Sequence, residues 1–232
     1  MLTDTATTQA VLDVVGVFVF ALSGAVVAVR GGLDVFGILV LAWVAGLGGG
    51  IIRDLFLGIT PPVAVTDWQL LAAAVAAAVL VFLLHGRWEE VAARTPDVRW
   101  RRLPYAVRLL DAGGLAIFAV NGALVALSAG AGALASTLIG GITAVGGGVM
   151  RDVLAGRVPE VLQRELYALP ALLGAALVVL ADYLGVTSRW TIWGSVALVF
   201  TIRVVAVALD LNAPTALRTT RTARTEPDSA GD

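Results

Sequence analysis

The chain has 232 residues, of which 59% are hydrophobic and 14% are charged, and its formal net charge at pH 7 is −1. An average soluble domain is about 45–50% apolar and about 25% charged, so this composition indicates a protein whose main solvent is the lipid bilayer. The low net charge excludes a nucleic-acid binder that works by counterion release, and the absence of cysteine excludes disulfides and thiolate metal sites.

Seven apolar runs are long enough to cross a bilayer, which takes about 20 residues at 1.5 Å per residue. The first run follows a segment without Lys or Arg, so it lacks the positive region of a signal peptide and we expect it to be retained. The fold class is therefore an all-α integral membrane protein. In chain order the predicted spans are 11–29, 35–57, 67–85, 106–128, 132–155, 165–184 and 190–210.

The spans divide into two three-helix units and one extra helix. The first unit covers 11–85, and a polar cytoplasmic linker over 86–105 joins it to the second unit over 106–184. A seventh helix covers 189–210. The Thr- and Arg-rich tail over 211–232 is predicted to be disordered.

Arginines in the loops predict the orientation in the membrane, because cytoplasmic loops carry an excess of positive charge. The N-terminus shares its side with the loops after the second, fourth and sixth spans, and this side carries only Arg189. We therefore expect a multi-pass cell-membrane protein with its N-terminus outside and its C-terminus in the cytoplasm. The other side carries Arg30, Arg87, Arg94, Arg99, Arg101, Arg102, Arg108, Arg157, Arg164, Arg218, Arg221 and Arg224.

An internal repeat relates the two units. Residues 47–62 (LGGGIIRDLFLGITPP) match residues 145–160 (VGGGVMRDVLAGRVPE), a displacement of 98 positions that places Gly49 on Gly147. Each unit has an odd number of spans, so the second copy is inverted, and inverted repeats place the working site at their interface. Further pairs at the same displacement are Asp13 and Asp111, Ser23 and Asn121, Arg53 and Arg151, and Asp54 and Asp152.

Each unit carries a glycine triad inside a span. One Gly within a helix costs about 1 kcal/mol relative to Ala, so three together predict a kink whose freed carbonyls suit a cation. The alternative is close packing of helices, which small residues allow. The matched positions of the triads favour a pore or gating hinge. The triads are Gly48, Gly49 and Gly50 in the second span and Gly146, Gly147 and Gly148 in the fifth.

Charged residues inside spans cost at least about 2.5–3.5 kcal/mol and usually face a protein interior or a cavity. Asp13 and Arg53 lie at matching depths near the outer ends of their spans, and Asp111 and Arg151 lie near the inner ends of theirs. We therefore predict two ion pairs, Asp13–Arg53 and Asp111–Arg151, one toward each mouth. The alternative is that these pairs only fix helix packing.

Polar residues on the same helices are predicted to line the pore. Ser23 and Asn121 lie deeper in the first and fourth spans, where they either face a pore or hydrogen-bond between helices. Arg203 in the last span has no repeat counterpart; it pairs with Asp210, contacts lipid headgroups, or gates the inner mouth. The predicted pore-lining polar residues are Ser23, Asn121, Arg53, Arg151, Asp54 and Asp152.

Several motifs are missing from the sequence. There is no Walker loop, HExxH motif or nucleophile elbow, so neither an ATP-driven pump nor an enzyme is predicted. The single histidine, His85, has no second ligand nearby, so we expect no metal site. No acidic residue lies near the centre of a span, where a proton-coupled carrier often keeps one. We expect no cofactor, apart from permeant K⁺ or Na⁺.

At the twin GGGxxRD motifs the sequence resembles the prokaryotic branch of the trimeric intracellular cation (TRIC) channel family, which overlaps bacterial membrane proteins with glycine-transporter-type domains. The resemblance covers about residues 10–210. It implies a 3+3+1 helix plan, a homotrimer in the lipid bilayer with one pore per subunit, and permeation of monovalent cations, chiefly K⁺, past kinked second and fifth helices. Transferred to this chain, the kinks fall at the glycine triads, with Arg53 and Arg151 as their polar neighbours.

Three functions follow as hypotheses. The first is a K⁺-preferring channel in which water, hydroxyls and carbonyls freed at the glycine breaks replace part of the hydration shell of the ion. The second is a secondary transporter of glycine or another small amino acid, because paired half-helix N-termini suit a carboxylate. The third is a membrane scaffold that transports nothing.

Overall fold

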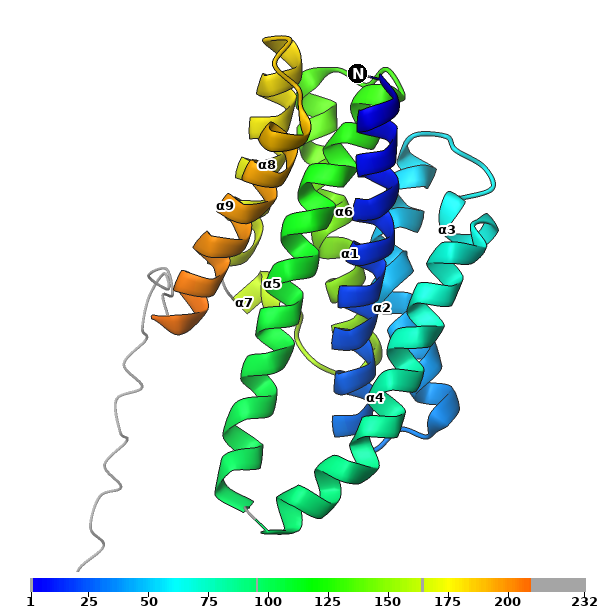
Figure 1. Ribbon diagram of the computed structural model, residues 1–232, viewed down its shortest axis with the longest axis vertical. Coiled ribbons are helices and arrows are strands. Elements are labelled where there is room, and N and C mark those ends of the chain that lie inside the picture. The colour runs from blue at the N-terminus through cyan, green and yellow to red at the C-terminus, as the bar shows by residue number, and fades with distance from the viewer. Residues whose placement is uncertain (1, 95, 164, 210–232) are drawn as a thin grey trace, which may run out of the picture.

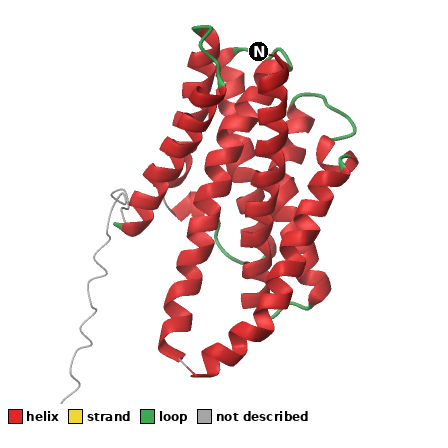
Figure 2. Cartoon of the chain, viewed as in Figure 1, coloured by secondary structure: helices red, strands yellow, loops and turns green. Residues whose placement is uncertain are grey.

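The computed structural model describes residues 2–94, 96–163 and 165–209, and within them all regular structure is helical (Figures 1 and 2). The predicted tail, 211–232, lies outside the described residues. The long helices run up and down in one bundle. The helices are α1 (Leu2–Arg30), α2 (Val35–Phe56), α3 (Val63–Thr66), α4 (Trp68–Arg94), α5 (Pro96–Ser128), α6 (Ala133–Leu154), α7 (Glu160–Gln163), α8 (Glu165–Tyr183) and α9 (Arg189–Ala208).

The long helices agree with the predicted spans. Among the described residues, six helices are long and apolar enough to cross a membrane: α1, α2, α4, α5, α6 and α9. The remaining predicted span corresponds to α8, whose apolar segment Tyr167–Tyr183 is shorter. Local signals set the helix ends. Asp34 accepts a hydrogen bond from Gly37 N at 2.8 Å at the start of α2, and Ser188 forms a capping box with Thr191 at the start of α9.

The stretch predicted as a linker, 86–105, is helical in the structure apart from residue 95, which is not described. The helix α4 continues through Arg94, and α5 begins at Pro96, where proline is favoured as a first helical residue. Glu, Ala and Arg in this stretch are good helix formers, so the helices continue beyond the point where the apolar sequence stops. The two extensions reach beyond the bundle at the end opposite the N-terminus (Figure 1).

The two units pack face to face. The first consists of α1, α2 and α4, and the second consists of α5, α6 and α8, with α1 against α5 and α2 against α6. The short helices α3 and α7 follow α2 and α6 at equivalent places, and α9 packs against α5 and α8. The region where α1, α2, α5 and α6 meet is therefore the interface of the inverted repeat.

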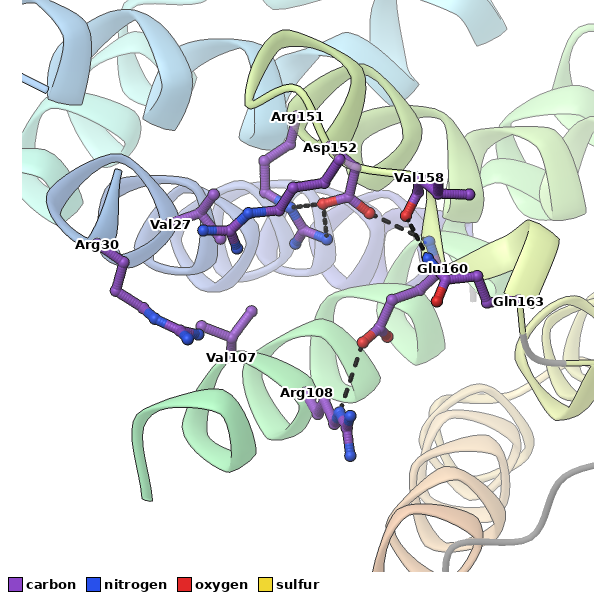
Figure 3. A pocket seen from close by; sticks show the side chains of 10 residues that line it. Val27, Arg30, Val107, Arg108, Arg151, Asp152, Val158, Glu160 and Gln163 are labelled. Atoms are coloured by element: carbon purple, nitrogen blue, oxygen red, sulfur yellow. Dashed lines mark hydrogen bonds and ion pairs between the residues drawn. The ribbon is translucent and has the colours of Figure 1, made fainter. Parts of the chain in front are cut away.

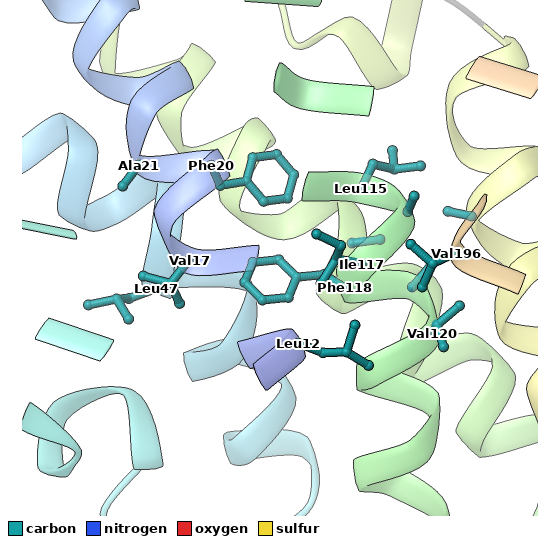
Figure 4. Packing of buried hydrophobic residues seen from close by; sticks show 14 of the residues in the cluster. Leu12, Val17, Phe20, Ala21, Leu47, Leu115, Ile117, Phe118, Val120 and Val196 are labelled. Carbon is teal, nitrogen blue, oxygen red and sulfur yellow. The ribbon is translucent and has the colours of Figure 1, made fainter. Parts of the chain in front are cut away.

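Two phenylalanines related by the repeat stack at the centre of this interface (Figure 4). The rings of Phe20 and Phe118 lie 5.5 Å apart between centroids, with 22° between their planes. Each ring packs over a glycine of the other unit. A methyl group added at Gly16 would lie 2.7 Å from Phe118 Cε1, and one added at Gly114 would lie 2.5 Å from Phe20 Cδ2. The repeat therefore provides both the knob and the hole for the contact between its two copies.

The helices α2 and α6 are helical at every residue of the glycine triads, so the structure shows no break there, and the predicted kink stays a prediction. Instead the glycines bring the two backbones together. A methyl group on Gly49 would overlap the carbonyl oxygen of Thr143, and one on Gly147 would overlap that of Ala45. Breaking a helix in lipid leaves costly unpaired backbone groups, whereas close packing keeps them bonded and adds van der Waals contact. We call this α2–α6 contact the glycine seam.

Candidate functional site

The first cluster consists of Asp13, Arg53, Asp54 and Asn121 and lies toward the end of the bundle where α1 begins and α2 ends. The Arg53 side chain is buried; its Nε donates to Asp54 Oδ1 at 2.8 Å, and its Nη1 lies 3.4 Å from Asp13 Oδ1. Asn121 Nδ2 donates to the same Asp13 oxygen at 2.7 Å. The second oxygen of Asp54 accepts from the backbone N of Val63 at 2.8 Å, which ties the start of α3 to α2.

The second cluster consists of Ser23, Asp111, Arg151 and Asp152 and lies toward the opposite end. Arg151 Nε donates to Asp152 Oδ1 at 2.9 Å, and Nη1 donates to Asp111 Oδ1 at 2.8 Å and to Ser23 Oγ. Asp152 Oδ2 accepts from the backbone N of Glu160 at 3.2 Å, which ties α7 to α6. Both predicted ion pairs, Asp13–Arg53 and Asp111–Arg151, are thus present in the structure.

Each cluster is completed by a side chain from the other unit. Ser23 of the first unit contacts Arg151 of the second, whereas Asn121 of the second unit contacts Asp13 of the first. Of the two roles considered for Ser23 and Asn121, the structure therefore shows hydrogen bonding between helices. Asp54 is fully buried, whereas Asp152 borders a cavity. Sequence reasoning missed that each unit supplies a side chain to the cluster of the other unit. The inverted repeat places the middle of α1, which carries Ser23, beside the middle of α5, which carries Asn121.

A cavity of about 450 Å³ lies beside the second cluster (Figure 3). Glu160 occupies one side of it, 3.6 Å from Arg108 Nε and 3.9 Å from Arg203 Nη2. Burial raises the pKa of the Glu160 carboxyl above its ordinary value, and the charge of Asp111 acts in the same direction, whereas Arg203 and Arg108 oppose it. The charged residues lining the cavity are Arg30, Arg108, Arg151, Arg157, Asp152 and Glu160.

Arg203 is 1% exposed, so its side chain does not reach lipid headgroups. Its guanidinium lies over the ring of Tyr167, 4.6 Å from the centroid, and faces Glu160. The predicted partner Asp210 lies outside the described residues. Sequence reasoning missed Glu160 and Tyr167 as site residues. The sequence marks these two residues only because they differ from the other copy of the repeat, which has Pro62 in place of Glu160 and Gln69 in place of Tyr167.

The fold and the two clusters define an integral membrane protein built from an inverted repeat with buried ion pairs at the repeat interface. A family model described as "Glycine transporter" matches residues 10–86 and 108–183, once in each unit. Two curated relatives are the UPF0126 membrane protein of Deinococcus radiodurans, 42% identical over 72% of this chain and 73% of the relative, and the UPF0126 inner membrane protein YadS of Escherichia coli K12, 40% identical over 74% and 78%.

Solved structures resemble the whole bundle. A TRIC trimeric intracellular cation channel orthologue from Rhodobacter sphaeroides is 38% identical, with a TM-score of 0.77 over 88% of this chain and 100% of the other. A second TRIC cation channel structure is 34% identical, with a TM-score of 0.75 over 90% and 97%. The chain therefore belongs to the TRIC channel family, and it is also related to UPF0126 membrane proteins and matches the glycine-transporter family model in both units.

Proposed function

We propose that this chain is a monovalent cation channel that prefers K⁺ and has one pore per subunit. The observation that carries the proposal is the pair of buried arginine–carboxylate clusters at the repeat interface, because charges inside a bilayer mark ion pathways and inverted repeats place their sites there. Relatives of known structure with 38% and 34% identity are named as cation channels, which supports the same function.

An arginine beside a cation path is unfavourable unless it is neutralised. In both clusters two carboxylates face one guanidinium, Asp13 and Asp54 in the first and Asp111 and Asp152 in the second. Each cluster therefore carries one net negative charge when its groups are ionised. This arrangement attracts a cation, while the arginine limits how tightly the cation is held.

The proposed path leads from the cavity past Arg151, along the glycine seam and past Arg53. The backbones of α2 and α6 touch at Gly49 and Gly147, between the two clusters, so an ion passes only when this contact widens. We therefore place the gate at the seam, with the glycine triads as the hinge. This gate replaces the carbonyl sites expected from broken helices.

In the membrane we propose a homotrimer with the N-terminus outside. The neighbour from Rhodobacter sphaeroides is named as trimeric, and the distribution of arginines supports the orientation.

Because the chain lacks cysteine, a single cysteine substitution can be labelled without background and tests the orientation. With a membrane-impermeant maleimide on intact cells, Val186→Cys should react and Leu162→Cys should not; the reverse pattern would overturn the orientation.

The channel is tested with purified protein in a planar bilayer under a KCl gradient. We expect ohmic unitary steps that reverse near the K⁺ equilibrium potential, and a shift of the reversal potential toward K⁺ selectivity when one side is changed to NaCl. The family description points to an alternative, the transport of glycine. Saturable glycine uptake into proteoliposomes without unitary currents would replace the channel by a carrier.

A further inference from the structure

Glu160 is bound less closely by arginine than the two aspartates of the second cluster. Asp111 and Asp152 each lie 2.8 Å from a nitrogen of Arg151. The Glu160 oxygens lie 3.6 Å from Arg108 Nε and 3.9 Å from Arg203 Nη2, and both distances exceed that of a hydrogen bond. Among the described residues, the buried oxygen Oε2 of Glu160 has no hydrogen-bond partner. The negative charge of Glu160 is therefore only loosely neutralised.

A proton can reach Glu160 from the cavity. The residue lies on the cavity wall (Figure 3), and its side chain is 24% exposed. Every long helix near the cavity contributes charged or titratable groups around it. These are Arg30 of α1, Arg108 and Asp111 of α5, Arg151 and Asp152 of α6, Arg157 of the loop after α6, Tyr167 of α8 and Arg203 of α9.

These surroundings make Glu160 easier to protonate than an ordinary glutamate. Burial raises the pKa of its carboxyl, and the charge of Asp111 adds to this, although Arg203, Arg108 and Arg151 lower the pKa. The arginines around it stay protonated at all physiological pH values. Mild acid on the cavity side therefore neutralises Glu160 and leaves the arginines charged.

Protonation of Glu160 changes the charge that a cation meets at this end of the bundle. Five arginines face three carboxylates when Glu160 is ionised, and two when it is neutral. The first cluster has no such acid, because Pro62 occupies the position equivalent to Glu160. There Asp54 accepts instead from the backbone N of Val63. A titratable acid outside the shared arginine–carboxylate cluster is thus found at the equivalent positions only beside the second cluster.

We propose that Glu160 determines how strongly the cavity side of the pore attracts cations, so that its protonation lowers the cation current. The inference rests on the proposed channel function. Ionised Glu160 partly offsets the arginines where the proposed path begins, next to Arg151, and neutral Glu160 does not. One unit charge in a water-filled mouth changes the local cation concentration about twofold. The current should therefore fall as the pH on the cavity side falls through the raised pKa of Glu160.

Single-channel conductance in planar bilayers tests this role when the pH of one side at a time is lowered from about 7.5 to about 5. Each wild-type channel should lose about half its conductance with acid on one side and none with acid on the other. Glu160→Gln should show the reduced conductance at both pH values. A Glu160→Gln channel that keeps the wild-type response would overturn the inference.

His85→Gln is the matched control, because histidine ordinarily titrates in the same pH range and His85 is not among the residues that line the cavity. This variant should keep the one-sided response, and its loss would overturn the role of Glu160. The failure of the channel itself is distinct: a wild-type protein without cation current at neutral pH overturns the proposed function, whereas a current with no one-sided response overturns only this inference.

Arg108→Gln gives a second test that remains valid if Glu160→Gln does not fold. Arg108 lowers the pKa of the Glu160 carboxyl, so its removal should shift the midpoint of the conductance change to higher pH. A purely structural role of Glu160 would not move this midpoint. An unchanged midpoint, or a shift to lower pH, would overturn the inference.

Discussion

The first and second clusters come from the same repeated sequence, yet their surroundings differ. In both, an arginine at the end of a long helix faces two carboxylates and the cluster receives one side chain from the other unit. Only the second is bordered by an acid on a short helix, Glu160, and by Arg203 from α9, which has no repeat counterpart. The repeat thus builds the shared scaffold, and the residues that depart from it give one end its own chemistry.

The two ion pairs also differ in closeness and burial. Arg151 and Asp111 lie 2.8 Å apart with side chains 2% and 1% exposed, whereas Arg53 and Asp13 lie 3.4 Å apart and Asp13 is 21% exposed. A partly exposed pair is screened by water, and a buried pair is screened much less. The second pair should therefore matter more for stability.

The largest expected effect is that of Asp111→Asn, which leaves Arg151 buried with one of its two carboxylates. Removing one partner of a buried ion pair typically costs about 3–5 kcal/mol of the free energy of unfolding. Asp13→Asn is the matched variant and should cost less, because that pair is longer and partly exposed. Unfolding in detergent measures both. Equal losses would contradict the difference between the clusters, and unchanged conductance in a destabilised variant would assign the pair to structure alone.

A smaller effect is expected at the glycine seam, which joins the regions of the two clusters. Gly49→Ala places a methyl group against the Thr143 carbonyl, and overpacking of this kind costs about 1–3 kcal/mol. Gly50→Ala is the control: its methyl group would have only Arg53 Nη2 nearby, at 3.9 Å, and alanine favours the helix by up to about 1 kcal/mol. Thermal unfolding and the open probability of the channel distinguish them. A stable, normally gating Gly49→Ala would argue against the seam as the gate.

The smallest effect is expected where the units exchange side chains. Ser23→Ala removes the hydrogen bond from Arg151, and such bonds within membranes contribute about 0.6–1.7 kcal/mol. Ser128→Ala serves as the control, because that hydroxyl bonds only the Val125 carbonyl of its own helix and is exposed. Urea or thermal unfolding should show a loss for Ser23→Ala and none for Ser128→Ala. Equal values would mean that the exchange does not hold the units together.

Some of the site could be predicted because it depends on local pattern. The length of the apolar runs determines the spans, and the GGGxxRD repeat determines the inverted pairing of the two units. The ion pairs Asp13–Arg53 and Asp111–Arg151 followed from depth alone, because a charge inside a span needs a partner at the same level. The helical structure of the linker, 86–105, was not predicted, because polarity ends an apolar run but good helix formers continue the helix.

Tertiary structure decided the rest. Whether three glycines bend a helix or press it against another depends on what lies opposite, and here Gly49 lies against Thr143 of α6. The contacts of Ser23 with Arg151 and of Asn121 with Asp13 join residues of different units that no periodicity relates. Sequence pattern reports which segments cross the bilayer, because hydropathy is a property of each helix. The partner that packs against each helix is a property of the whole bundle.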